Sequence, residues 1–135
     1  MDDNVYNRFN SIKTLYYSEH LKAIANGEIP LPVIWHVYPT NKCPHNCSFC
    51  IMKQDRAGLE ELPRETLLKA VRTAKKYSEA IHFSGGGEPL MHPDIMEAIK
   101  EAKGITRIMS TNGFLLTDEI AKELDSVRIS INAGT

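Results

Sequence analysis

The spacing of apolar and polar positions changes several times along the chain, and each change predicts a different element. Residues 9–26 (FNSIKTLYYSEHLKAIAN) carry apolar side chains at roughly helical spacing before Gly27, which predicts a leading helix. Pro30 and Pro32 then interrupt the backbone. Residues 33–38 (VIWHVY) are an apolar run rich in β-branched and aromatic side chains, as is typical of a buried strand.

Strand-like and helix-like segments continue to alternate after residue 60. The helix over 63–77 begins at Pro63, and a later helix begins after Thr117, whose hydroxyl is a predicted N-cap. The remaining predicted elements are strands over 79–84, 106–110 and 127–132 and a helix over 94–104. Strands that alternate with single helices pair in parallel through right-handed crossovers, as in doubly wound sheets and α/β barrels.

Polar, glycine-rich or cysteine-rich segments follow three of the predicted strands. The cysteine segment follows the first strand, SGGGEP (84–89) follows the second, and TNG (111–113) follows the third. In both candidate architectures ligands bind at the carboxyl ends of the strands. The sequence therefore predicts one shared binding site at that edge of the sheet.

Composition narrows the class of protein. A chain of 135 residues with 42% hydrophobic content can bury one core, and its formal charge of -1 gives no general attraction for nucleic acid or an anionic membrane. The N-terminus MDDNVYNRFN lacks a basic region followed by an apolar one, and no window approaches the roughly 18 apolar residues of a membrane span. We expect a cytoplasmic protein with neither nucleic acid nor membrane as its partner.

All three cysteines of the chain lie within KCPHNCSFC (42–50). Cys43, Cys47 and Cys50 have the spacing C-x3-C-x2-C, which lets one loop wrap three thiolates around a compact metal centre. Three ligands on a four-iron cluster leave one iron open, as a reactive centre requires. The alternative is zinc held by these thiolates with His45 or a distant histidine, although structural zinc usually takes its ligands in pairs from two loops. Thiols without a metal are a further alternative.

The SGGGEP segment is less informative by itself. Its three glycines permit close approach of the backbone to a ligand, and Glu88 offers a carboxylate to a cationic group. A flexible turn between a strand and a helix explains the same residues, and without the cysteines it is the favoured interpretation. The segment lacks the G-K-[ST] ending of a phosphate loop and does not match G-x-G-x-x-G.

The cysteine motif, with Phe49 before its last cysteine, and the GGE segment after the second strand together resemble the radical S-adenosylmethionine superfamily. The resemblance covers residues 33–132 and includes TNG and the SIN of the fourth strand. It is closest to the branch that contains molybdenum-cofactor-biosynthesis and peptide-maturation enzymes. It implies a partial parallel (βα) barrel of the TIM type with its first four strands present, formed by residues 32–135 and preceded by a helical extension over residues 1–31.

The resemblance also implies cofactors and their ligands. Cys43, Cys47 and Cys50 would bind a [4Fe-4S] cluster whose fourth iron takes the amino and carboxylate groups of S-adenosylmethionine. A one-electron reductant such as flavodoxin or ferredoxin would drive reductive cleavage to a 5′-deoxyadenosyl radical that abstracts a substrate hydrogen. The substrate is unknown, a peptide or a small metabolite. Candidate cofactor contacts are the backbone near Phe49 at the adenine, Gly86, Gly87 and Glu88 at the methionine amino group with Gly85 as an additional glycine, and Ser110, Asn112, Ser130 and Asn132 at the carboxylate and ribose.

The chain departs from the family in length, because the family barrel commonly has six strand-helix units and this sequence stops after the fourth strand. We expect the N-terminal part of a longer enzyme that alone binds a cluster poorly and turns over little. The alternatives are that a second chain completes the barrel or that the sequence is a degenerate remnant. The strand over 127–132 would be an open edge that invites self-association. The other hypotheses are a zinc-binding module and a non-catalytic interaction scaffold. His36 and His82 fall inside strands, where histidines are more often structural than ligands.

Overall fold

The computed structural model describes residues 16–53 and 60–131, and its contacts divide the chain into two units, 1–31 and 32–135. The described part of the first unit holds helix α2 (Ser18–Ala25), which Gly27 follows with a positive φ of 80°. Of the helix predicted over 9–26, residues 16, 17 and 26 lie outside α2. Tyr17 has a ψ of 40°, outside the helical region, and residues 9–15 lie outside the described residues.

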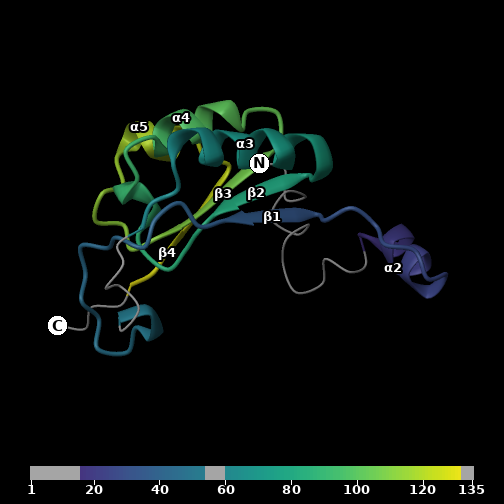
Figure 1. Cartoon of the computed structure of the whole chain (residues 1–135), viewed down its shortest axis with the longest axis horizontal. Helices are drawn as coiled ribbons and strands as arrows, with labels where there is room; N and C mark the ends of the chain where they lie inside the picture. Colours follow the sequence, from purple (N-terminus) through teal and green to yellow (C-terminus); the bar gives the residue numbers. More distant parts are fainter. Residues whose placement is uncertain (1–15, 54–59, 132–135) are drawn as a thin grey trace. The chain divides into compact units, whose positions relative to one another are not determined.

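The second unit is built on a four-stranded sheet in the order β1-β2-β3-β4 with every pair parallel (Figure 1). Its strands are β1 (Ile34–Val37), β2 (Ala80–Phe83), β3 (Thr106–Thr111) and β4 (Ser126–Ile129). The fourth strand ends at Ile129 and not at residue 132 as predicted. The neighbouring strand β3 ends at Thr111, which is the register partner of Ile129, so the pairing of β4 with β3 ends there as well.

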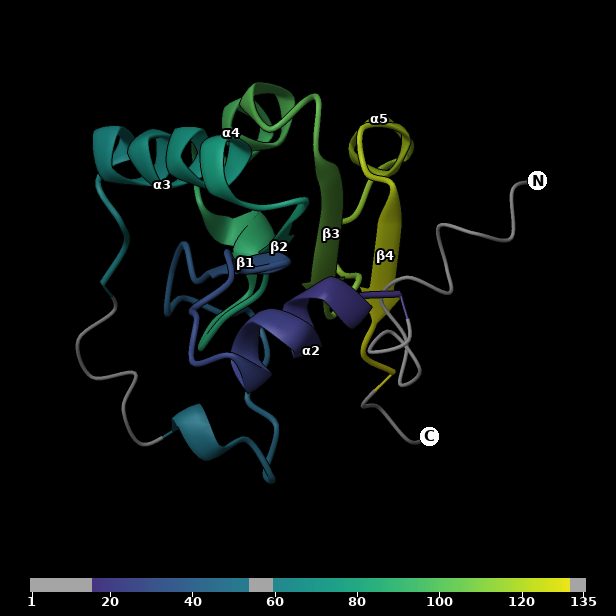
Figure 2. The same cartoon turned by 90° about the vertical axis from the view of Figure 1, so that its right-hand side faces the viewer.

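Three helices cover one face of this sheet, as Figure 2 shows. They are α3 (Arg64–Tyr77), α4 (Ile95–Glu101) and α5 (Asp118–Lys122), with short 3-10 turns η2 (Ile51–Lys53) and η4 (Pro89–Met91) in the loops. Sequential strand order with helices on a single face is the arrangement of an α/β barrel, whereas a doubly wound sheet carries helices on both faces. The structure thus confirms the predicted four-stranded part of a barrel, as an open sheet.

Local signals account for where these helices begin and end. The Thr117 hydroxyl accepts a hydrogen bond from the Ile120 N–H at 3.3 Å, as predicted for an N-cap. Helix α4 ends at Glu101, earlier than the predicted residue 104, and Gly104 then takes a φ of +109° that other residues rarely adopt. No helix among the described residues is long and apolar enough to cross a membrane.

The core lies between the helices and the sheet, and strand alternation decides which side chains enter it. Val37, Phe83 and Met109 point toward the helices and pack against Leu67, among others. The neighbouring strand positions point to the opposite face, which bears polar side chains. The core therefore holds the strands in register, and the loops after them share one edge of the sheet.

Candidate functional site at the carboxyl ends of the strands

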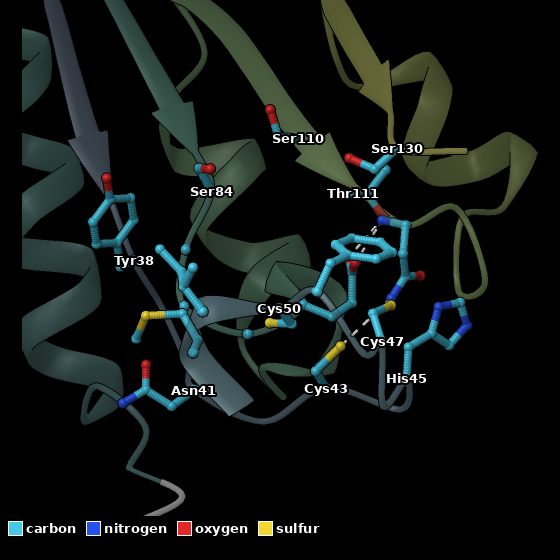
Figure 3. Close-up of a pocket in the computed structure, with 18 residues that line it drawn as sticks. Tyr38, Asn41, Cys43, His45, Cys47, Cys50, Ser84, Ser110, Thr111 and Ser130 are labelled. Atoms are coloured by element: carbon cyan, nitrogen blue, oxygen red, sulfur yellow. Dashed lines mark hydrogen bonds between the residues drawn. The ribbon is translucent and has the colours of Figure 1, made fainter. Parts of the chain in front are cut away.

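A cavity of about 580 Å³ lies where the loops after the strands meet (Figure 3). This volume is within the roughly 300–1,000 Å³ range of small-molecule sites. Eleven of the twelve predicted site residues line it, and Asn132 lies outside the described residues. The eleven are Cys43, Cys47, Phe49, Cys50, Gly85, Gly86, Gly87, Glu88, Ser110, Asn112 and Ser130.

The loop that carries the cysteines is held at its base by backbone hydrogen bonds. Leu62 N–H donates to the Pro39 carbonyl at 2.8 Å, and Asn41 N–H donates to the Glu60 carbonyl at 3.0 Å. The buried Thr40 hydroxyl accepts from Lys42 N–H at 3.0 Å. These bonds fix the backbone that leads into Cys43, so the cysteine loop projects over the cavity from a defined stem.

The glycine segment packs directly on this stem. Gly87 N–H donates to the Thr40 carbonyl at 3.1 Å, and Glu88 N–H donates to the Lys42 carbonyl at 2.7 Å. A Cβ at Gly87 would lie 2.2 Å from the Lys42 carbonyl oxygen, and one at Gly86 would lie 2.7 Å from Asn41 Oδ1. Glycine is therefore required at position 87 because two backbones meet, whereas the neighbours of Gly86 are flexible side-chain ends.

Glu88 joins the glycine segment to the TNG turn. Its side chain is only 2% exposed. One carboxylate oxygen accepts hydrogen bonds from the Thr111 hydroxyl at 2.7 Å and the Leu90 N–H at 3.2 Å, and the other accepts from the Asn112 N–H at 2.7 Å. A buried carboxylate with three donors holds its surroundings rigidly. It thereby fixes the end of β3 relative to the loop after β2.

The TNG turn presents a side-chain amide to the cysteine loop. Asn112 Oδ1 accepts from the Phe114 N–H at 2.9 Å, which orients the amide so that Nδ2 points to Cys43 Sγ at 3.8 Å. The Thr111 hydroxyl accepts from the Gly113 N–H at 3.0 Å while it donates to Glu88. Cys43 and Asn112, 69 residues apart in the sequence, therefore face each other across the cavity.

Sequence reasoning missed the supporting residues Thr40, Thr111 and His92. His92 is 2% exposed, and its ring bridges Leu62 and Asp94 through hydrogen bonds of 2.8 and 3.1 Å. Asp94 N–H donates to Nδ1, so Nε2 carries the proton that is donated to the Leu62 carbonyl. A threonine or histidine beside a motif carries no local signal for such contacts.

The thiols fit a cluster held by three cysteines. Cys43, Cys47 and Cys50 form no disulfide and are partly exposed, and Figure 3 shows them on one side of the cavity, with Ser84, Ser110 and Ser130 at the strand ends on the other. Among residues 16–53 and 60–131, no group of three or more His, Cys, Asp or Glu side chains forms a candidate site for a metal ion. The three thiols instead line a space large enough for an inorganic cluster together with a small molecule.

Two curated proteins are similar in sequence to this chain. The chain is 36% identical over 98 residues to a tungsten-containing aldehyde ferredoxin oxidoreductase cofactor-modifying protein of Pyrococcus furiosus, which covers 68% of this chain and 27% of that protein. It is 34% identical over 136 residues to an S-adenosylmethionine-dependent nucleotide dehydratase of Lacinutrix mariniflava, and this alignment covers 92% of this chain and 28% of that protein. This chain thus spans a little over a quarter of the length of each relative.

A solved structure and a family model extend the comparison. The crystal structure of BtrN in complex with AdoMet and 2-DOIA aligns with a TM-score of 0.61 at 18% identity, covering 79% of this chain and 49% of that one, which shows a common fold. The model of the radical SAM superfamily matches residues 37–134. This match begins at Val37, the last residue of β1, and includes the whole of β2, β3 and β4 and all three cysteines. The chain therefore belongs to the radical SAM superfamily, whose members use a [4Fe-4S] cluster and S-adenosylmethionine.

Proposed function

We propose that residues 32–135 are the cofactor-binding half of a radical S-adenosylmethionine enzyme and that residues 1–31 are a helical extension. The observation that carries the proposal is the single cavity lined by the three thiols, the GGE segment and Asn112. Family membership supports S-adenosylmethionine-dependent radical chemistry in general terms. When bound, the cluster and the cofactor supply reductive cleavage to a 5′-deoxyadenosyl radical that removes a hydrogen atom from the substrate.

The residues of the chain bind and orient these groups. Cys43, Cys47 and Cys50, which line the cavity, would hold the cluster. Phe49, which is 64% exposed beside the cavity, contacts the adenine. The methionine amino group meets Gly85, Gly86, Gly87 and Glu88, and the carboxylate and ribose meet Ser110, Asn112, Ser130 and Asn132.

Glu88 acts mainly as a positioning residue in this proposal. Its carboxylate already accepts three hydrogen bonds, two of them from Thr111 and Asn112. The carboxylate therefore fixes the cavity wall opposite the cysteines, while the adjoining backbone is free to meet the cofactor. The result is a site whose two walls are joined before any ligand enters, which lowers the entropy cost of binding.

The chain also requires an electron donor and a substrate. We propose a one-electron reductant such as flavodoxin or ferredoxin. The 34% identical relative is named as acting on a nucleotide, and this favours a small metabolite over a peptide as the substrate.

Metal analysis after anaerobic reconstitution tests the proposal. The wild-type chain and the variants Cys43→Ala, Cys47→Ala and Cys50→Ala would be reconstituted with iron and sulfide, desalted, and analysed for iron, sulfide and zinc. Because the chain alone is expected to bind a cluster poorly, we expect the wild type to retain iron and sulfide at less than one cluster per chain and each variant to retain none. Retention that is absent, or equal in all four proteins, would overturn the proposal.

His45→Ala distinguishes the cluster from zinc. His45 lies in the same loop and lines the cavity, and it is the histidine that a four-ligand zinc site would use. In a cluster site with three thiolates, His45→Ala leaves the retention of iron and sulfide unchanged. Zinc held at one ion per chain, without sulfide, and lost in His45→Ala would show a zinc-binding module instead.

A further inference from the structure

The sheet face opposite the helices is partly polar. Barrel interiors are usually filled by bulky branched apolar side chains. Here each of the four strands places at least one polar side chain on this face, beside the apolar Ile34, Ala80 and Ile108. The polar side chains include His36, His82, Ser110 and Arg128 at the centre of the face.

These four residues form a row that runs diagonally across the sheet, because the register partner of His82 on β3 is Ile108 and Ser110 lies two residues further along that strand. His36 and His82 are register partners on β1 and β2, with ring centroids 4.8 Å apart. His82 Nε2 lies 2.8 Å from Ser110 Oγ on β3, and Ser110 is the register partner of Arg128 on β4. Because Ser110 also lines the cavity, the row adjoins the proposed cofactor site directly.

The charge on this face has one sign. The Arg128 side chain is exposed, and its guanidinium makes no hydrogen bond or ion pair with any residue in the described parts of the chain. The described strand positions on this face include no aspartate or glutamate. Arg107, which points to the other face, is by contrast paired with Glu123 at 3.3 Å and Asp125 at 3.1 Å. Of these two arginines, Arg128 is therefore the one whose guanidinium has no acidic partner among the described residues.

The histidines contribute hydrogen-bonding groups beside that cation. Burial lowers the pKa of His82 to about 4, with smaller contributions from His36 and Arg128, so its ring is neutral at pH 7. A neutral imidazole carries one N–H and Ser110 one O–H, and one of these protons is used in the 2.8 Å hydrogen bond between them. With Nε2–H donating to Oγ, the Ser110 hydroxyl is the donor left for an anion. A guanidinium beside such a donor matches the geometry of a phosphate or carboxylate.

We propose that the row His36, His82, Ser110 and Arg128 binds the anionic group, a phosphate or a carboxylate, of the substrate. The site would place that group on the inner face of the sheet, with the rest of the substrate extending toward the cavity. The identification of the bound molecule as a substrate rests on the proposed function, whereas the affinity for an anion rests on the row itself. The carboxylate of S-adenosylmethionine has the same chemistry and is the competing source.

Titration of the unreconstituted chain with inorganic tripolyphosphate tests the anion site. Imidazole resonances of His36 and His82 would be followed by NMR in the wild type, in Arg128→Gln and in Arg72→Gln. Arg72 is an exposed arginine on α3, away from the row, and is the matched control. We expect both histidines to shift, and the dissociation constant to rise about tenfold or more in Arg128→Gln alone, because a charge-assisted contact is lost.

Two results would overturn the anion site: histidine resonances that do not move, or equal affinities in the two arginine variants. A second titration on the reconstituted protein with saturating S-adenosylmethionine identifies the source of the anion. If tripolyphosphate binds as before, the site is separate from the cofactor and the proposal stands. If S-adenosylmethionine displaces it, the row binds the cofactor carboxylate and the substrate assignment is wrong. Failed reconstitution would count against the proposed function, while the first titration would still decide the anion site.

Discussion

Replacing Gly87 by alanine should separate the cysteine loop from the glycine segment. The new Cβ would lie 2.2 Å from the Lys42 carbonyl oxygen and 2.5 Å from the Asn41 carbonyl carbon, and both are backbone atoms. No rotamer change can relieve these contacts, so the two backbones must move apart by about 1 Å to reach ordinary separations. The move stretches the hydrogen bonds from Gly87 N–H and Glu88 N–H to the stem, now 3.1 and 2.7 Å long.

The expected cost follows from these contacts. Overpacking at a well-packed position costs about 1–3 kcal/mol, and each weakened hydrogen bond adds up to about 1 kcal/mol. Reduced flexibility of the unfolded chain returns about 0.4–1 kcal/mol. Gly87→Ala should therefore lower the free energy of unfolding by about 2–4 kcal/mol.

Gly86→Ala is the matched control. Its Cβ would meet Asn41 Oδ1 at 2.7 Å and Met52 Cε at 2.9 Å, which are the ends of flexible side chains. These can move away, so we expect a loss below about 1 kcal/mol.

Urea unfolding followed by fluorescence of the single tryptophan, Trp35, measures both variants, since this side chain packs against the core from β1. Hydrogen exchange at the amides of Gly87 and Glu88 should also accelerate in Gly87→Ala only. Equal unfolding free energies for Gly86→Ala and Gly87→Ala, with protected amides in both, would refute the close backbone packing on which this reasoning depends.

Three further predictions concern buried residues. Glu88→Gln places an amide N–H donor where a carboxylate oxygen accepts from Thr111 or Asn112, and it should lower the free energy of unfolding in urea by about 2–3 kcal/mol. An unfolding midpoint equal to that of the wild type would contradict the role of the carboxylate. Because the unfolded chain protonates His82 near its ordinary pKa of 6.5 and the folded chain only near about 4, stability should fall as pH drops between these values. The loss should reach about 2 kcal/mol after allowance for solvent screening on the open face, and His82→Phe should reduce it in urea titrations at pH 7 and pH 4.5. Leu67→Ala at a fully buried position should lower the unfolding free energy by about 2–5 kcal/mol, and a loss under 1 kcal/mol would argue against the core packing.

The elements of the fold could be predicted because their signals are local. The apolar face of α3, the N-cap at Thr117 and the apolar β1 strand are each encoded within a few consecutive residues. The end of β4 could not be predicted, because it depends on where the neighbouring strand β3 ends, at Thr111, the register partner of Ile129. Strand limits that are set by a neighbour require knowledge of the register.

The site divides in the same way. The thiols and glycines lie in two short motifs, so their meeting at one edge follows from the parallel strand order. The functions of Thr111 and His92 depend on partners 23 and 30 residues away, Glu88 and Leu62. The polar row on the inner face likewise emerges only once the register pairs His36 with His82 and the His82 side chain reaches Ser110.

Electron paramagnetic resonance of the anaerobically reconstituted and reduced chain, with and without S-adenosylmethionine, tests the central claim most directly. The claim is that one cavity holds a cluster with an open iron and the cofactor that binds to it. We predict a [4Fe-4S] signal that shifts when S-adenosylmethionine is added and that disappears in Cys47→Ala. The absence of a cluster signal, or a signal that the cofactor leaves unchanged, would contradict it.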